Sequence, residues 1–337
     1  MSAENGNRSS RERVIEELRG SDKFIVVTHE NPDGDALGSL IAMQEILTAL
    51  GKECAMFIDA GELPLPPEYR WFSLDGLVTA PPDDLDKRTI VFLDCGNLDR
   101  NPAEAFQRPG AHMLNIDHHH DNTCFGTVNL VVDEASCTAE IIWDLMHDLG
   151  VSATPTIAEA LYVGLITDTG RFMYENTSPR AHLMAADLID AGVDVADIYR
   201  RVYEDVPYGK LALLARGLAN VRRYDGGRLT VTSLSEREFE EAGADESYSE
   251  GLIDHLRAVE GTAVAALVRD RMGATDGDKL RKVSLRSRDG RVDVSRIARR
   301  QGGGGHRQAA GFTTAMDWEE LVTFLRGEIA EQLATPA

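Results

Sequence analysis

The strongest constraint on the fold is an alternation in the first half of the chain between short apolar runs rich in β-branched residues and longer segments of helical period. Such runs are typical of parallel strands that helices cover, because both faces of the sheet are then buried. The predicted strands are residues 24–28, 54–58, 89–93, 112–116 and 128–132. The predicted helices are residues 37–50, a helix from an N-cap at Ser136 to Leu149, and residues 157–167, opened by Pro155. We therefore expect an α/β domain with a mainly parallel sheet flanked by helices.

The pattern changes after residue 193, where strand signals stop and a charged segment of helical period begins. Further on, strands are predicted at residues 228–233, 263–270 and 281–287, the last two joined by a turn at residues 273–278, and Asp293 caps a short helix. This second domain is expected to be a smaller α+β unit. The predicted organisation is a disordered leader at 1–20, a first domain at 21–193, a helical connector at 194–219 and a second domain at 220–337.

The charge balance limits the partners of the chain. With 35 Lys and Arg against 56 Asp and Glu, the 337 residues carry a formal charge of −21, which argues against a binder of long nucleic acid. No apolar run approaches the ~20 residues needed to span a bilayer, so no membrane partner is expected. The four cysteines show no CxxC spacing, which predicts a reduced, cytoplasmic setting.

The loop after the first predicted strand carries the first candidate site residues. It reads THENPDGDALGS and supplies His29, Asp33 and Asp35. Ligands of open α/β sheets gather outside the carboxyl ends of the strands, which is where this loop lies. The alternative is a turn with solvated aspartates in which Asp35 only caps the next helix, and this motif alone does not decide between the two.

Further candidate residues follow other predicted elements. An Asp after a strand is often only a cap, but an Asp followed by three histidines indicates ligands or phosphate binders. An acid at a helix C-terminus opposes the helix dipole and needs a positive charge, which a metal would supply. The residues are Asp94 in FLDCG, Asp117, His118, His119 and His120 in NIDHHHDN, and Asp168 in GLITDTG.

Carboxylates and imidazoles without a thiolate favour manganese or another first-row divalent ion over magnesium, which prefers oxygen ligands. The ligands are too many for one ion. Two ions ~3.5–4 Å apart could share a carboxylate and a water and support an in-line phosphoryl displacement.

These motifs in this order resemble the DHH superfamily of phosphoesterases. The resemblance rests on HxxxDxD, on the Asp after an apolar strand, on DHHxxN from Asp117 to Asn122, and on the Asp of ITDTGRF; the late GGGGHRQAAGF resembles the companion DHHA1 domain. It covers about residues 21–313 and is closest to the branch that degrades short oligonucleotides, 3′-phosphoadenosine 5′-phosphate and cyclic or linear dinucleotides.

Carried over by position, the resemblance implies two Mn²⁺ ions, with Mg²⁺ or Co²⁺ as substitutes. One ion would be held by His29, Asp33 and Asp94, and the other by Asp35, Asp94, His118 and Asp168. Asp94 would bridge the two ions. His119 would face the substrate phosphate, and Asp117 would orient the pair His118 and His119, whereas His120 lies outside the core motif and receives no role.

The glycine run of the second domain suggests a phosphate site. Without Cβ atoms, the successive amides of Gly302, Gly303, Gly304 and Gly305 can close around an anion, with His306 and Arg307 beside it. The alternative is a flexible linker. Residues 281–307 carry nine basic residues against two acidic ones, and Arg286 and Arg307 are the candidates for phosphate contacts.

The expected function is therefore a manganese-dependent hydrolase of short nucleotides, such as oligoribonucleotides of about 2–5 residues, 3′-phosphoadenosine 5′-phosphate, or cyclic di-AMP and its linear form. A homodimer is expected on the resemblance alone. The alternatives are a manganese pyrophosphatase or polyphosphatase, a RecJ-like single-strand exonuclease, and a nucleotide-sensing regulator without turnover.

Overall fold

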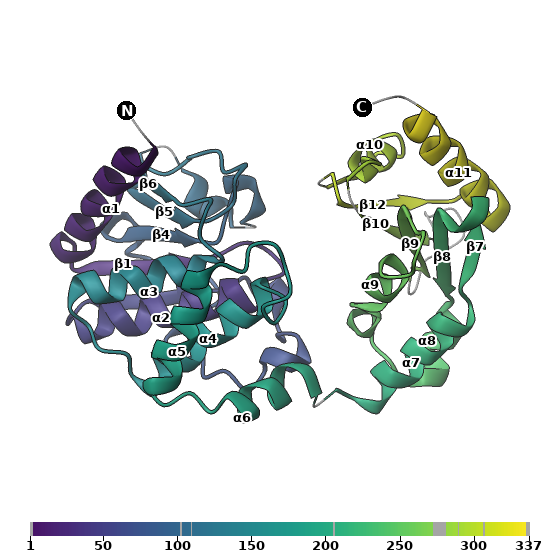
Figure 1. The fold of residues 1–337 in the computed structure, drawn as a ribbon. Helices are drawn as coiled ribbons and strands as arrows, with labels where there is room; N and C mark the ends of the chain where they lie inside the picture. The colour runs from purple at the N-terminus through teal and green to yellow at the C-terminus, as the bar shows by residue number, and fades with distance from the viewer. Residues whose placement is uncertain are drawn as a thin grey trace. The chain divides into compact units, whose positions relative to one another are not determined.

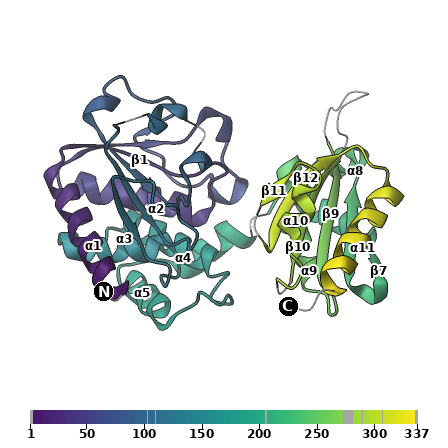
Figure 2. The ribbon, with the colours of Figure 1, turned by 90° about the horizontal axis from the view of Figure 1, so that it is seen from above.

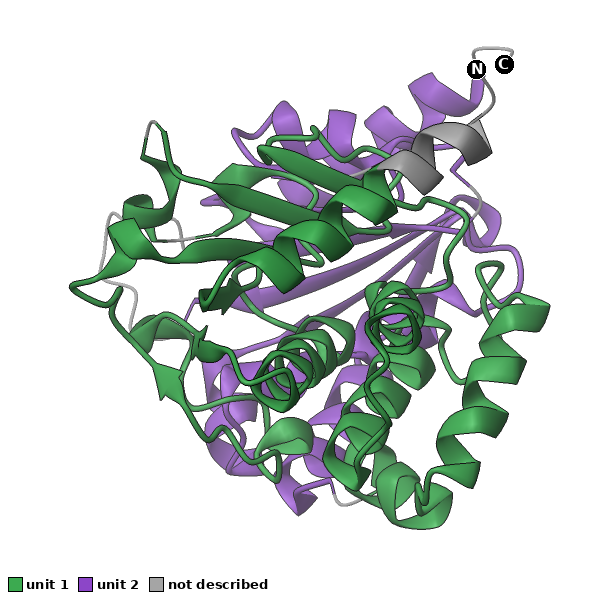
Figure 3. Cartoon of the chain, turned by 90° about the vertical axis from the view of Figure 1, so that its left-hand side faces the viewer, with its two compact units in different colours: residues 1–205 green, residues 206–337 purple. Residues whose placement is uncertain are grey.

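The computed structural model describes residues 3–101, 103–108, 110–204, 206–271, 281–288, 290–305 and 307–334. The chain divides into two compact units, Met1–Asp205 and Val206–Ala337, which Figure 3 distinguishes by colour. Each unit has a sheet and a core of its own. They are described separately below.

Unit 1 is built on a six-stranded parallel sheet in the order β3-β2-β1-β4-β5-β6. The strands are β1 (Lys23–Val27), β2 (Glu53–Phe57), β3 (Leu77–Val78), β4 (Thr89–Leu93), β5 (Met113–Asp117) and β6 (Val128–Val131). The five predicted strands are confirmed to within one residue at each end. The sequence analysis missed β3, because a two-residue edge strand has no periodicity to detect.

Helices cover one face of this sheet, as Figures 1 and 2 show for α2, α3 and α4. The other face is covered by short helical turns, which contribute Leu85 and Phe106 to a smaller core around Ile25 and Phe92. The helices are α1 (Ala3–Gly20), α2 (Gly34–Ala49), α3 (Thr138–Leu149), α4 (Pro155–Asp168), α5 (Pro179–Asp190) and α6 (Val195–Tyr199). The short helical segments of unit 1 are η1 (Ala60–Glu62), η2 (Pro67–Tyr69), η3 (Leu85–Lys87), η4 (Leu98–Arg100), η5 (Glu104–Gln107) and η6 (Arg200–Glu204), of which η2 and η6 pack into the main core with the helices.

The prediction of a disordered leader at residues 1–20 is wrong, because α1 occupies this segment. Val14 and Leu18 lie one turn apart on one face of α1 and are fully buried in the main core of unit 1. Arg11 adds an ion pair to Asp148, with its Nε 2.6 Å from Oδ2. Two apolar side chains at helical spacing therefore anchor a segment whose overall polarity is typical of disorder.

The prediction of Ser136 as the N-cap of α3 is also wrong by one residue. Cys137 is the N-cap, and its side chain makes no capping bond. Instead, the carboxylate of Asp35 accepts hydrogen bonds from the amides of Thr138 at 2.7 Å and Ala139 at 2.9 Å. A residue more than 100 positions away thus satisfies the first turn of α3, which no local capping signal can indicate.

Unit 2 has a mixed six-stranded sheet in the order β11-β12-β10-β9-β8-β7, in which β8 and β9 are parallel and the other pairs antiparallel. Its strands are β7 (Arg222–Tyr224), β8 (Leu229–Leu234), β9 (Val264–Asp270), β10 (Arg281–Ser287), β11 (Gly304–Gly305) and β12 (Ala309–Thr314). Its helices are α7 (Tyr208–Ala219), η7 (Asp225–Gly227), α8 (Glu236–Ala242), η8 (Glu246–Ser249), α9 (Leu252–Arg257), α10 (Val294–Arg299) and α11 (Trp318–Ala334).

Three strands of unit 2 are as predicted, and β9 and β10 pair antiparallel as expected of a hairpin. The turn predicted at residues 273–278 lies outside the described residues. The sequence analysis missed β12, because its small residues do not resemble a strand, although Phe312 is buried in the core. The predicted connector at 194–219 comprises α6, η6 and α7, and the boundary between the units falls within it.

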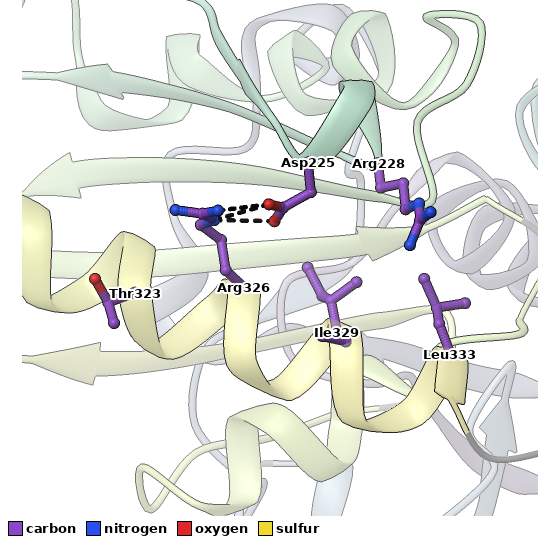
Figure 4. Close-up of a pocket in the computed structure, with 7 residues that line it drawn as sticks. Asp225, Arg228, Thr323, Arg326, Ile329 and Leu333 are labelled. Carbon is purple, nitrogen blue, oxygen red and sulfur yellow. Dashed lines mark hydrogen bonds and ion pairs between the residues drawn. The ribbon is translucent and has the colours of Figure 1, made fainter.

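An ion pair ties α11 to the edge of the sheet in unit 2. The Arg326 guanidinium lies 2.9 Å and 2.6 Å from the two carboxylate oxygens of Asp225 in η7, beside a cavity of about 400 Å³ (Figure 4). Both side chains are partly exposed, so solvent screens the pair and its contribution to stability is small. Burial of Leu321, Leu325 and Ile329 is therefore the main force that holds α11 in place.

None of the helices in the described part of the chain combines the length and the apolar composition needed to cross a membrane.

Candidate metal centre

The candidate site residues of unit 1 meet at the carboxyl ends of β1, β4 and β5. Strand β1 lies between β2 and β4, so the chain order reverses at the β1–β4 pair. Loops that leave neighbouring strands at such a point diverge and open a crevice for ligands. His29 and Asp94 follow these two strands closely, and Asp117 is the last residue of β5.

The first group consists of His29, Asp33 and Asp94, whose potential ligand atoms all lie within 4.8 Å of one another. His29 Nε2 is 3.5 Å from Asp94 Oδ2. Asp33 is the N-cap of α2, and its Oδ1 accepts hydrogen bonds from the amides of Asp35 and Ala36, each at 3.0 Å. These bonds fix the direction of the Asp33 carboxylate.

The second group consists of Asp35, His118 and Asp168, again with ligand atoms within 4.8 Å of one another. Asp94 joins it, because His118 Nε2 lies 3.6 Å from Asp94 Oδ1 and 3.7 Å from Asp168 Oδ2. The structure thus brings together the two residue sets that the resemblance assigns to two ions, and Asp94 contacts both. That these residues bind metal stays a prediction.

The backbone at Asp94 is held in an unusual conformation. Its φ is +55°, in the left-handed region that Asp tolerates better than most residues but that still costs energy. The residue is 2% exposed, and the Thr138 hydroxyl donates to its Oδ1 at 3.1 Å. Strain of this kind persists where the surroundings hold one geometry, and it concentrates at functional sites.

The carboxylates of the centre repel one another. Burial raises the pKa of Asp35 well above its usual range, and the charges of Asp94 and Asp168 raise it further. Burial also raises the pKa of Asp168 to about 6, although His118 opposes the shift. For Asp94, burial alone would raise the pKa, but the imidazoles of His29, His119 and His118 together outweigh it and lower the pKa to about 2. A divalent cation would relieve this repulsion, so the residues present fit a metal ion.

His119 and Asp117 form a hydrogen-bonded pair beside the two groups. His119 Nδ1 donates to Asp117 Oδ1 at 2.8 Å, and Asp117, which is fully buried, also accepts from the His118 amide and from the side chain of Asn122. Burial would lower the pKa of His119, but the bond to Asp117 and the charge of Asp94 raise it to about 9. His119 is one-third exposed and His120 is exposed, so a substrate can reach the His119 ring.

Unit 2 places part of the glycine run on a cavity of about 630 Å³. The lining residues are Arg271, Lys282, Val283, Ser284, Gly302, Gly303, Gly311, Phe312 and Thr313. Arg271 and Lys282 bring positive charge to it, and Lys282 Nζ also lies 3.8 Å from Glu246 Oε1. The sequence analysis did not single out Arg271 or Lys282. The period-2 spacing of Lys282 and Ser284 on β10 could have shown that these two side chains share a face of the sheet.

The glycine amides do not form the nest expected from the sequence. The amide of Gly302 donates to Arg299 O at 3.1 Å and that of Gly303 to Ala298 O at 3.0 Å, so both satisfy the end of α10. Gly304 and Gly305 pair with β12 as a short strand. Two of the four amides are therefore already hydrogen-bonded to backbone carbonyls. The role of the glycines is instead to let segments of the backbone pack closely together.

The other predicted phosphate contacts have separate outcomes. Arg307 Nε donates to Gly290 O at 2.8 Å, and Arg307 does not line the cavity. Arg286 is partly buried on the same face of β10 as Lys282 and Ser284, with its Nη1 donating to the neighbouring Leu285 carbonyl. His306 lies outside the described residues.

Comparisons with known proteins identify a family model for each of the two units. The model of the DHH family, N-terminal domain, matches residues 23–165, and that of the DHHA1 domain matches residues 226–334. The bifunctional oligoribonuclease and PAP phosphatase NrnA of Thermus thermophilus is 36% identical over 316 residues, which cover 91% of this chain and 89% of that protein. The protein of the same name from Bacillus subtilis is 27% identical over 302 residues, which cover 89% and 91%.

Among solved structures, an exopolyphosphatase-related protein from Bacteroides fragilis has the same fold. It superimposes with a TM-score of 0.86 over 96% of both chains, at 24% sequence identity.

Proposed function

The chain belongs to the DHH family, with a DHHA1 domain as its second unit, and is a hydrolase of phosphoester bonds; from this premise we propose that it hydrolyses short nucleotides with two Mn²⁺ ions. The proposed substrates are oligoribonucleotides of about 2–5 residues, 3′-phosphoadenosine 5′-phosphate, and cyclic or linear dinucleotides. The observation that carries the proposal is the pair of ligand groups that share Asp94.

The donor set supports the choice of metal. Each group combines carboxylate oxygens with one imidazole nitrogen, a mixture that suits manganese and cobalt better than magnesium. In the proposal, His29, Asp33 and Asp94 hold one ion, and Asp35, Asp94, His118 and Asp168 hold the other. When bound, the ions would lower the pKa of a water molecule and neutralise charge on the phosphoryl group.

His119 is proposed to act on the substrate itself. The bond from Nδ1 to Asp117 and the charge of that carboxylate raise the pKa of His119 and favour the protonated ring, whose Nε2 proton is then left for another acceptor. A phosphate oxygen of the substrate is such an acceptor. His119 would thus stabilise negative charge in the transition state or protonate the leaving oxygen, with Asp117 fixing the ring.

Unit 2 is proposed to bind the part of the nucleotide that is not cleaved. The cavity with Arg271 and Lys282 offers positive charge in a chain whose formal charge is −21. A local cationic site on a strongly acidic molecule favours short anionic substrates over long ones, because each additional phosphate meets the repulsive surroundings. Arg286, Gly304, Gly305, His306 and Arg307 remain proposed neighbours of this site.

A substrate panel tests the proposal. The purified protein is incubated with Mn²⁺ and, separately, with a diribonucleotide, a pentaribonucleotide, 3′-phosphoadenosine 5′-phosphate, linear and cyclic di-AMP, a 40-residue single strand and pyrophosphate. We expect mononucleotide or phosphate from at least one of the short nucleotides and far slower turnover of the long strand and of pyrophosphate. Preferred cleavage of pyrophosphate or of the long strand would overturn the proposal in favour of the corresponding alternative.

Gly304→Val tests the proposed role of unit 2. A Cβ at Gly304 would meet no atom within 4 Å, so the fold should accept a side chain there. We expect KM for a dinucleotide to rise by about tenfold, or roughly 1.4 kcal/mol of lost binding, with the Mn²⁺ requirement unchanged.

The matched comparison is Gly303→Val, in which the Cβ would lie 2.2 Å from Gly311 O and 2.5 Å from Phe312 Cβ. This variant should lose stability in urea denaturation, whereas Gly304→Val should not. An unchanged KM in Gly304→Val would contradict a substrate site next to β11.

For assembly and location we propose a homodimer in the cytoplasm. The four cysteines are free thiols, which accords with a reducing compartment.

A further inference from the structure

Residues 135–139, which run from the loop after β6 into the first turn of α3, lie against the proposed site of the second ion. No side chain in it belongs to the ligand groups described above. Its contacts nevertheless reach all four residues assigned to that ion, directly or through one intermediate.

Two contacts are made by the amides at the start of α3. The amides of Thr138 and Ala139 donate to Oδ2 and Oδ1 of Asp35 at 2.7 and 2.9 Å. The carboxylate is 1% exposed, and its Oδ1 also accepts from the Ser39 hydroxyl at 3.4 Å, so these protein donors fix its direction in the site. The positive end of the α3 dipole stabilises the same charge.

Thr138 also reaches the shared carboxylate. Its hydroxyl donates to Asp94 Oδ1 at 3.1 Å, and both residues are buried. One residue therefore contacts Asp35 through its backbone and Asp94 through its side chain, which sets the spacing between the two carboxylates.

His118 is oriented by the carbonyl at the beginning of the segment. Its Nδ1 lies 3.4 Å from Ala135 O, which places the proton on Nδ1 and leaves the lone pair on Nε2. That nitrogen is the one that lies 3.6–3.7 Å from Asp94 and Asp168.

Asp168 is connected to the segment through Asn176. The Asn176 Nδ2 donates to Ser136 O at 2.8 Å and to Asp168 Oδ2 at 3.0 Å. The hydroxyl groups of Ser136 and Ser178 are 3.2 Å apart and join the same two stretches of chain a second time.

We propose that residues 135–139 form the positioning element of the second metal ion, with Thr138 and Asn176 as its side-chain contacts. This inference rests on the proposed function, because it presupposes that Asp35, Asp94, His118 and Asp168 bind a metal. Partners of this kind hold ligands in the geometry that the ion requires, and their loss costs about 10–100-fold in metal affinity.

The test is direct measurement of Mn²⁺ binding by equilibrium dialysis, without substrate. Thr138→Val keeps the shape and the amide but removes the hydroxyl, and Thr138→Ser restores the hydroxyl. We expect Thr138→Val to weaken Mn²⁺ binding by at least about tenfold and Thr138→Ser to stay within about threefold of the wild type. Thr89→Val is the control, because Thr89 lies on β4, the strand that Asp94 follows, and its hydroxyl donates to the Ser21 hydroxyl and not to a proposed ligand.

Asn176→Ala is the second variant, in case Thr138→Val does not fold. It removes the link to Asp168, a residue assigned to one ion only, so the number of tightly bound Mn²⁺ ions should fall from two to one. Wild-type affinity in a folded Thr138→Val, or two tight ions in Asn176→Ala, would overturn the inference. A wild-type protein that binds no Mn²⁺ would instead overturn the proposed function.

Discussion

Asp94→Asn is expected to abolish turnover and to remove tight metal binding at the same time. Asp94 contacts His29 of one ligand group and His118 of the other, so its loss affects both proposed ions. Asparagine keeps the size of the side chain but removes the charge that attracts the cations. We expect activity to fall by more than about 100-fold, beyond the range seen when only an outer partner of a ligand is lost.

The measurements for Asp94→Asn are kcat with a dinucleotide and the Mn²⁺ content after dialysis. Asp99→Asn is the control, since Asp99 is an exposed acid of the same loop in η4. Circular dichroism should show that both variants are folded. If Asp94→Asn retained Mn²⁺ with wild-type affinity, Asp94 would not be the shared ligand.

His119→Ala is expected to separate catalysis from metal binding. Its Nδ1 is already bonded to Asp117, and in the proposal its ring serves the substrate. Loss of a positioned acid typically costs about 10²–10⁴-fold in rate, so kcat should fall in this range. The Mn²⁺ affinity and the number of bound ions should stay at the wild-type values.

The adjacent His120→Ala is the matched control, because His120 is exposed and has no assigned role. It should retain wild-type kcat. The contrary outcome for His119→Ala is also specific: potential ligand atoms of Asp94, His118 and His119 lie within 4.8 Å of one another. Loss of Mn²⁺ from this variant would therefore show that His119 is a ligand and that its role was misassigned.

The sequence was sufficient to predict five strands of the sheet in unit 1 and the edge at which the candidate residues gather. Buried parallel strands produce apolar runs that are easy to detect, and their carboxyl ends must lie at one edge. His29 and Asp94 follow two such runs closely and Asp117 follows a third. The sequence therefore predicted that these three side chains lie close together, without knowledge of any long-range contact.

What the sequence did not reveal depends on contacts between distant segments. The bond from Thr138 to Asp94 joins residues 44 positions apart, and neither has a local pattern that indicates the other. The amide nest failed for a related reason: whether Gly302 and Gly303 bind an anion depends on whether α10 needs their amides at its end. The small residues of β12 become a strand because β10 and β11 pair with them.

The N-cap of α2 shows how closely fold and chemistry share atoms in this protein. One oxygen of Asp33 accepts two backbone hydrogens while the same carboxyl group lies within reach of His29 and Asp94. A substitution at this position would therefore injure the start of a core helix and the cation site together. An inactive variant could have lost the cap of the helix or the cation site. A replacement such as asparagine distinguishes the two losses, because it still caps a helix but brings no negative charge.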